Sequence, residues 1–172
     1  MMKDLFIKIF DHFGAGTKLF IDTPPQLSAV TQSATCALAQ IDMRSVFLIP
    51  LRADLFSLKG AKICLGELDN LVSAYKDVDR INVLCFLSSY DGRLKVSADT
   101  MRTVLEDEQL SKCICNVIVR QSSEVTKSAM RRENVFSSGS STSVTSDYLD
   151  LALYVYGQGQ GPAEGDNNNG LI

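Results

Sequence analysis

The fold is decided by the stretch from Gly60 to Ser97, which reads GAKICLGELDNLVSAYKDVDRINVLCFLSSYDGRLKVS. Its middle part, Glu67 to Lys76, repeats apolar residues at helical spacing, which predicts an amphipathic helix with one stripe to bury. The next part, Ile81 to Ser89, is apolar on nearly all sides and follows Asp79, a residue type that caps helices. We therefore predict that Ile81 to Ser89 is a helix in the core of the protein.

The same stretch leaves one alternative open. Ile81 to Leu87 can also form a strand, paired through the turn at Asp91-Gly92 with the alternating residues from Leu94 to Ala98. The loop SSYDG is long for a tight hairpin, and this length favours the helix. Further upstream, Lys62 to Leu65 is a short β-prone run, so a strand is expected before the first helix.

The residues nearest the amino terminus predict a hairpin and a helix. Asp4 to Phe10 alternates in polarity, and Lys18 to Asp22 returns after a glycine-containing turn, as two paired strands would. Thr23-Pro24-Pro25-Gln26 has the form of a capping box, and the apolar residues after it recur at three- and four-residue steps. A helix that ends at about Gln40 is expected there.

Three further segments are predicted to be strands. Ser45 to Arg52 is one, and Pro50 within it places that strand at an edge of a sheet or at a bulge. Lys112 to Arg120 and Asp147 to Tyr156 are the others, because both alternate apolar residues with residues on the opposite face. A short helix capped by Asp99 is expected between the first and second of them.

This mixture of a hairpin, helices and late strands predicts an α+β fold, with a small antiparallel sheet packed against two to four helices. The 172 residues, 45% of them hydrophobic, are enough for a single domain with a core, which we place at residues 1–156. Within that domain, residues 122–146 are polar and rich in Ser, so a mobile loop is expected. The tail at residues 157–172 lacks apolar spacing and is expected to be disordered.

Composition narrows the classes of function. Seventeen Lys and Arg against 20 Asp and Glu give a net charge of −3, which argues against nucleic acid as a partner. Five cysteines, several of them within apolar patterns, indicate reduced and buried thiols of a cytosolic protein. The chain also has no run of roughly 18 apolar residues, the length that a membrane-spanning helix needs.

The sequence contains three features that could indicate a phosphate-binding loop, a catalytic histidine or a zinc site, but the residues around each argue against that function. Gly14-Ala15-Gly16-Thr17-Lys18 leads into a strand-like run, whereas a phosphate-binding loop opens a helix. His12 is the only histidine and has no motif around it, which removes most catalytic dyads. Cys113 and Cys115 are predicted to share one face of a strand, but zinc would need two more ligands. No catalytic, cofactor or metal site is predicted, and the chain is expected not to be an enzyme.

Five residues are candidate interaction residues. Lys127, Arg131 and Arg132 form the one basic cluster, which can contact an acidic lipid or a phosphate, although it can equally solvate a loop. Ser137 and Ser138 begin the most Ser-rich segment, where phosphate groups can be accepted.

The central stretch resembles rhabdovirus matrix proteins, most closely those of the plant-infecting members. The resemblance lies in Leu84 to Ser89 followed by Arg93 to Val96. It implies a small twisted antiparallel sheet packed on helices, and a structural protein that self-associates and bridges the viral nucleocapsid and the inner face of the membrane. The implied partners are other copies of the chain, the viral nucleoprotein and that membrane face. The implied location is the virion and the host cytoplasm, peripheral to the host membrane.

Two other functions compete with this one. Gly60 to Leu65, after a Leu-Ile-Pro strand, is similar to the core of plant-virus movement proteins of the 30-kilodalton type, whose jelly-roll coat relatives end on long strands. A small cytosolic enzyme of unknown reaction comes third. Self-association is the hypothesis we favour, because edge-prone strands at residues 4–10, 45–52 and 148–156 would offer unpaired backbone to another copy.

Overall fold

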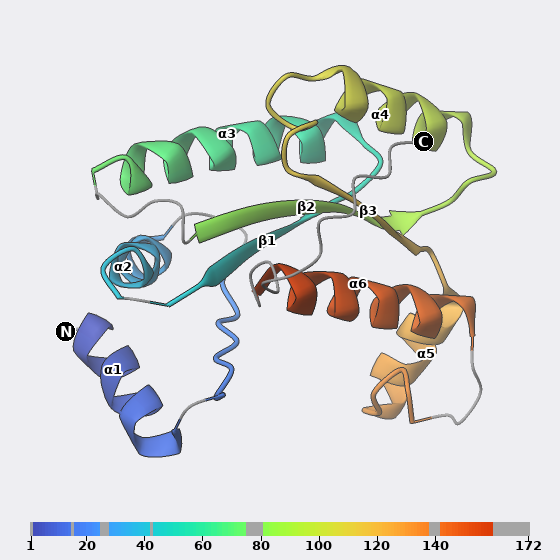
Figure 1. The fold of residues 1–172 in the computed structure, drawn as a ribbon. Coiled ribbons are helices and arrows are strands. Elements are labelled where there is room, and N and C mark those ends of the chain that lie inside the picture. The colour runs from blue at the N-terminus through green and yellow to red at the C-terminus, as the bar shows by residue number, and fades with distance from the viewer. Residues whose placement is uncertain are drawn as a thin grey trace, which may run out of the picture.

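The computed structural model describes residues 2–14, 16–24, 28–41, 43–74, 81–137 and 142–159, and everything below refers to these residues. Six helices and three strands alternate for much of the chain (Figure 1). Their order is α1 (Met2–Phe13), α2 (Ala29–Leu38), β1 (Ser45–Leu51), α3 (Leu55–Val72), β2 (Ile81–Tyr90), α4 (Lys95–Glu106), β3 (Ile114–Arg120), α5 (Ser123–Arg131) and α6 (Ser143–Gly159).

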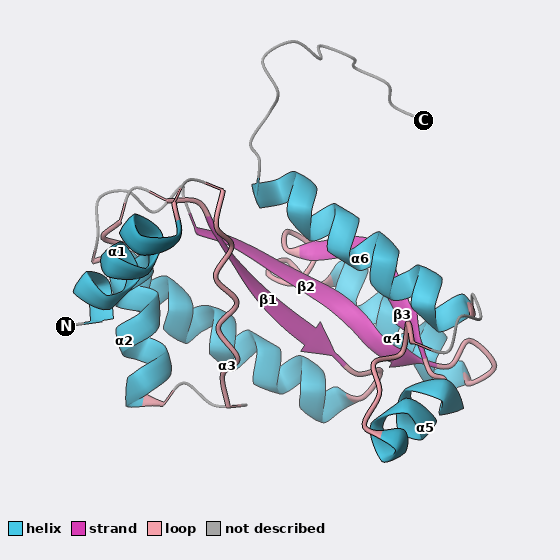
Figure 2. Ribbon diagram, turned by 90° about the horizontal axis from the view of Figure 1, so that it is seen from below, coloured by secondary structure: helices cyan, strands magenta, loops and turns pink. Residues whose placement is uncertain are grey.

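The three strands form one all-parallel sheet in the order β1-β2-β3. Parallel neighbours need long crossover connections, and α3 and α4 supply them. Both helices lie on one face of the sheet, and α6 lies across the other (Figures 1 and 2). The protein is therefore α/β, and the predicted α+β fold with an antiparallel sheet is wrong.

The error begins at β2, where the predicted helix at Ile81 to Ser89 is the central strand of the sheet. Leu87 packs in the core beneath α3 and α4, whereas the neighbouring Phe86 packs in the core beside α6. A strand buried on both faces is apolar on all sides, so periodicity cannot distinguish it from a core helix. The alternative is right that Ile81 to Leu87 is a strand, but its pairing with Leu94 to Ala98 is wrong, because Lys95 to Ala98 belongs to α4.

Two layers of core follow from this arrangement. The layer between the sheet and the α3–α4 face contains Ile49, Leu51, Leu58, Ala61, Leu65, Leu68, Cys85, Leu87, Val104 and Leu110. The layer between the sheet and α6 contains Phe86, Cys115, Val119, Val144 and Leu151. A separate cluster joins α1 to α2 through Phe6, Ala34, Ala37 and Ile41.

Three segments predicted as strands are helical. Asp4 to Phe10 lies in α1, Lys62 to Leu65 in α3, and Tyr148 to Tyr156 in α6. In α1, the inward contact comes from Phe6 and Phe10, which are one helical turn apart. Apolar residues occur so often in these segments that alternate positions and helical positions are both filled, and packing against neighbours selects the helix. With α1 helical, and Lys18 to Asp22 outside any strand, the predicted hairpin is wrong.

The Ser-rich region is also more ordered than predicted. Residues 123–131 form α5, whose amino terminus is capped by Ser122: its Oγ accepts a hydrogen bond from the Glu124 amide at 3.2 Å. Residues 143–146 begin α6, and α6 reaches Gly159 into the predicted tail. The rest of that tail, residues 160–172, and residues 138–141 lie outside the described chain.

Other predictions are confirmed. Ser45–Leu51 is a strand and lies at the edge of the sheet, as Pro50 indicates, and Ile114–Arg120 is a strand. A helix does precede β1, although its cap is Ser28, whose Oγ accepts from the Thr31 amide at 3.3 Å. Part of the predicted capping box, at residues 25 and 26, lies outside the described chain. Among the helices described, none has the length and apolarity to cross a bilayer.

Candidate functional site

The carboxyl ends of β2 and β3 lie side by side, and the chain leaves them in opposite directions. From β2 it continues to α4 on one face of the sheet, and from β3 it continues to α5 and α6 on the other (Figure 1). In open α/β sheets, connections that diverge in this way leave a crevice outside the strand ends, where ligands bind.

A cavity of about 570 Å³ occupies this position and is called the carboxyl-edge cavity below. The end of β2 contributes Ser89, β3 and the turn after it contribute Val119 to Ser123, and α6 contributes Tyr148. The wall on the α5 side consists of Val125, Thr126, Lys127 and Met130. Six of the eleven lining residues are polar but uncharged, and two, Arg120 and Lys127, are charged.

The rim of the cavity has a constrained backbone. Ser89 has a φ of 54°, in the left-handed region that a residue with a side chain rarely adopts. On the other side of the rim, the Gln121 amide donates a hydrogen bond to the Tyr90 carbonyl at 2.9 Å. This bond continues the pairing of β2 and β3 past their ends and fixes the two sides of the cavity relative to each other.

An ion pair between Arg120 and Asp147 anchors α6 beneath the cavity. The carboxylate of Asp147 is 7% exposed and accepts hydrogen bonds from the Arg120 backbone amide at 3.0 Å and from its guanidinium Nε at 2.9 Å. The guanidinium also donates to the Ser143 carbonyl at 3.1 Å. Hydrogen bonding from Arg120 holds the pKa of Asp147 below its ordinary value. A carboxylate held in this way serves structure rather than proton transfer.

The candidate interaction residues that the structure describes lie on α5 or shortly after it. Lys127 lines the carboxyl-edge cavity but pairs with Glu124 at 2.8 Å, and Arg131 pairs with Glu133 at 2.9 Å. Arg132 ends α5 in a left-handed conformation with a φ of 56°. Ser137 is exposed, and its amide donates to the Asn134 carbonyl at 3.0 Å. Ser138 lies outside the described residues.

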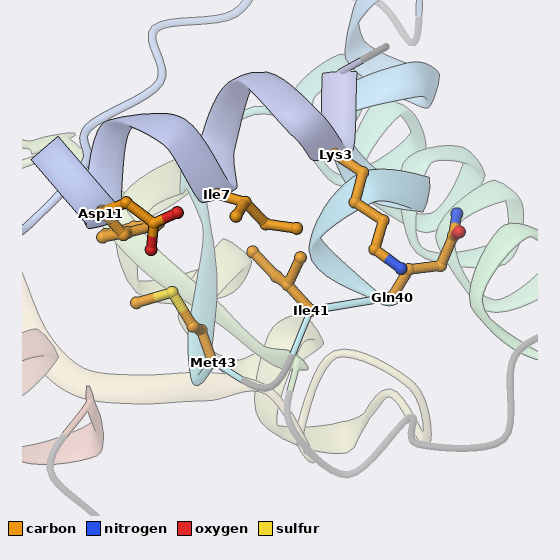
Figure 3. A pocket seen from close by; sticks show the side chains of 7 residues that line it. Lys3, Ile7, Asp11, Gln40, Ile41 and Met43 are labelled. Carbon is orange, nitrogen blue, oxygen red and sulfur yellow. The ribbon is translucent and has the colours of Figure 1, made fainter.

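A second cavity, of about 310 Å³, lies between α1 and the connection from α2 to β1. Figure 3 shows Ile7 and Ile41 pointing toward one another into it, with Met43 beside them. Lys3 and Asp11 stand at its two ends. Its walls are mainly apolar.

The histidine and the two cysteines considered as catalytic or metal-binding residues do not form a common site. His12 is in the last turn of α1 with its ring edge-on to Phe13, at 4.8 Å between ring centroids. Cys113 and Cys115 do not share a face, because Cys113 precedes β3 and packs against the α3–α4 layer, whereas Cys115 packs in the α6 layer. In the part of the chain that the structure describes, no three His, Cys, Asp or Glu residues are grouped as metal ligands.

The helix α6 carries a second apolar face, which we call the α6 stripe and define as Leu149, Leu153 and Tyr156. These residues are spaced by four and three positions, so they share one side of the helix. They are 53%, 62% and 47% exposed, whereas Val144 and Leu151 on the opposite side are buried against the sheet. Sequence reasoning missed both the stripe and the cavity, because each depends on α6 being a helix.

No protein-family model matches the chain, and no curated protein matches it significantly. Function is therefore argued from the α6 stripe and the carboxyl-edge cavity.

Proposed function

We propose that the chain is a non-enzymatic protein whose main activity is self-association, and that the α6 stripe is the contact. The observation that carries the proposal is the apolar character of α6 on two opposite sides. A helix on the outside of a layered α/β protein ordinarily has one apolar face and one polar face. A helix that is apolar all round is ordinarily buried, and the sheet buries only one side of α6.

A second copy of the chain is the occupant that fits the stripe. In a twofold dimer each surface meets itself, so an uncharged apolar stripe is self-complementary, whereas a charged patch would repel its copy. Lys18 approaches the stripe at Tyr156, where its Nζ lies 4.3 Å from the centre of the ring. This cation–π contact covers one end of the stripe and leaves Leu149 and Leu153 open.

The open edge of the sheet adds a second contact surface on the same side. In the described sheet β1 has a strand partner on one side only. By strand alternation, Leu48 and Pro50 point toward the face that α6 covers, and both remain exposed. A neighbouring copy can therefore bury apolar side chains of β1 together with the α6 stripe.

The parallel sheet differs from the antiparallel sheet of rhabdovirus matrix proteins, so self-association is argued here from the chain's own surface. A matrix-like role, in which the assembled chain bridges a nucleocapsid and a membrane, stays a proposal implied by the resemblance alone.

Substituting Leu153→Lys is expected to weaken self-association at least tenfold, because a charge in the middle of a twofold contact meets its own copy. The matched control is Leu105→Lys on α4, which makes the same chemical change at a residue of similar exposure, 59% against 62%. Light scattering and sedimentation across a concentration series would measure both variants against the unmodified chain.

Two results would contradict the proposal. One is an unmodified chain that remains monomeric up to high micromolar concentration at both low and moderate salt. The other is an equal loss of association in Leu105→Lys and Leu153→Lys, since that would show a general effect of charge and no role for the stripe.

A second function, the binding of a small polar molecule, is favoured by the carboxyl-edge cavity and its place between diverging connections. Thr126 lines this cavity from the exposed side of α5. We expect fragments found by ligand-observed NMR to lose binding in Thr126→Trp, which fills the cavity. Thr103→Trp on the exposed side of α4 is the control and should retain them. Fragments that bind both variants equally would place the ligand elsewhere.

A further inference from the structure

Two cysteines from different segments face each other in the core layer below α3 and α4. Cys85 is in β2, and Cys113 is the residue just before β3. Their Sγ atoms are 3.3 Å apart, and the Cys85 amide donates a hydrogen bond to the Cys113 carbonyl at 2.7 Å. Both are free thiols.

The two thiols differ in their access to solvent. Cys85 is fully buried, whereas Cys113 is half-buried at the end of the turn that leads into β3. Cys113 is therefore the more accessible of the two thiols to a small oxidant in solution.

We propose that Cys85 and Cys113 are an oxidation site for peroxide, in which Cys113 reacts first and Cys85 then closes an intramolecular disulfide. The proposal rests on the distance between the sulfurs and on their unequal exposure. The thiol chemistry agrees with this order. The hydrogen bond between the two thiols lowers the pKa of Cys113, whereas the same bond and burial raise the pKa of Cys85.

The reaction balances with hydrogen peroxide as the oxidant. The Cys113 thiolate attacks one peroxide oxygen, the O–O bond breaks, and the departing hydroxide takes up a proton to become water. Cys113 is then a sulfenic acid. The Cys85 sulfur attacks the Cys113 sulfur, the S–O bond breaks, and a second water leaves with the proton of Cys85. Two thiols and one peroxide thus give one disulfide and two waters.

The local backbone allows the two sulfurs to meet. A disulfide bond is about 2.05 Å long, so the sulfurs must approach by roughly 1.2 Å. Cys113 lies outside the regular strand, and the pairing of β2 with β3 is already irregular next to Cys85. The turn before Cys113 is held from its other end, where Asp107 accepts the Leu110 amide at 3.0 Å and contacts Lys62 at 2.6 Å. A small movement of Cys113 therefore suffices.

Cys115 and Cys64 are the other possible disulfide partners of Cys85, and they differ in where they lie relative to it. Cys115 packs in the α6 layer, on the far side of the sheet from Cys85. Cys64 on α3 packs against the same layer as Cys85, so a link between Cys64 and Cys85 is the alternative that an experiment must distinguish.

The test is treatment of the full chain with hydrogen peroxide, followed by blocking of free thiols and peptide mass mapping without reduction. We expect the Cys85 and Cys113 peptides to be joined, the chain to lose the mass of two hydrogen atoms, and a reducing agent to reverse both changes. The proposal is overturned if Cys85 and Cys113 both remain available for blocking after unfolding. It is also overturned if either is joined to Cys64, to Cys115 or to another chain.

Variants test the order of the two steps. In Cys85→Ala, the sulfenic acid of Cys113 should persist and be trapped by dimedone, and its absence would show that Cys113 is not the residue that meets peroxide. In Cys113→Ser, Cys85 should stay reduced under the same treatment, and its oxidation would contradict the proposed access. Cys36→Ser is the control and should form the disulfide as the unmodified chain does. If a variant fails to fold, the peptide map of the unmodified chain still decides.

Discussion

Leu87→Ala is expected to lower the free energy of unfolding by about 2–5 kcal/mol, because it leaves a cavity in the core layer between the sheet and the α3–α4 face. Leu87 is 1% exposed and sits in the middle strand, opposite Leu51 on one side and Ile118 on the other. A cavity at this point borders both neighbouring strands, and a surrounding sheet cannot collapse into it. Urea unfolding followed by circular dichroism measures the loss as a lower midpoint at an unchanged slope.

Phe86→Ala should lower the free energy of unfolding by a comparable amount, about 3–5 kcal/mol. Phe86 is next to Leu87 in the chain, so its side chain points to the other face of the sheet. Phe86 is 7% exposed and packs in the α6 layer, on the opposite face of the sheet. Two neighbouring residues with equally large effects are the signature of a strand that is buried on both faces. Leu105→Ala on α4 is the control: it is 59% exposed, and we expect a change within about 0.5 kcal/mol. A change that small for Leu87 or Phe86 would contradict the described sheet.

Asp147→Ala, outside the apolar core, is also expected to lower the free energy of unfolding, by about 2–4 kcal/mol. The substitution removes a buried acceptor and leaves the Arg120 amide without the carboxylate that it contacts at 3.0 Å. It also detaches the start of α6 from the end of β3. Asp99→Ala breaks the exposed pair between Asp99 and Arg102, and this control should change stability by less than about 1 kcal/mol. Equal effects of the two substitutions would show that burial of the Asp147 pair does not matter.

The ion pair between Arg120 and Asp147 also makes the free energy of unfolding depend on pH, in a direction that can be stated. The pKa of Asp147 is lower in the folded protein than its ordinary value, so ionisation of Asp147 stabilises the fold above about pH 4. That contribution is lost as the pH falls through the folded pKa. Asp91 and Asp107, whose pKa values are held at about 2 by Arg93 and Lys62, also become protonated at acid pH. The informative comparison is therefore with Asp147→Asn, in which those two groups are unchanged.

We expect the difference in unfolding free energy between the unmodified chain and Asp147→Asn to be constant from about pH 6 to 5 and to shrink below about pH 4. Urea midpoints measured at several pH values would show this. A difference that stays constant down to pH 3 would mean that the charge of Asp147 does not contribute.

The sequence by itself determined several features that depend on local chemistry. The strand at Ser45–Leu51 and its edge position follow from β-prone residues interrupted by Pro50, which cannot donate to a neighbouring strand. The strand at Ile114–Arg120 follows from a short β-prone run that places Cys115, Val117 and Val119 on one side.

Only the tertiary structure decided the rest, because it depends on what lies on both sides of each segment. Ile81–Tyr90 is a strand because two other strands flank it and core layers cover both its faces, and its sequence is equally suited to a buried helix. The same applies to α6, whose alternating sequence fits a strand until the sheet buries one side of it. The carboxyl-edge cavity, the Arg120–Asp147 pair and the Cys85–Cys113 pair all join residues distant in sequence. Such contacts are fixed by the parallel order of the strands, which no local pattern in this chain specifies.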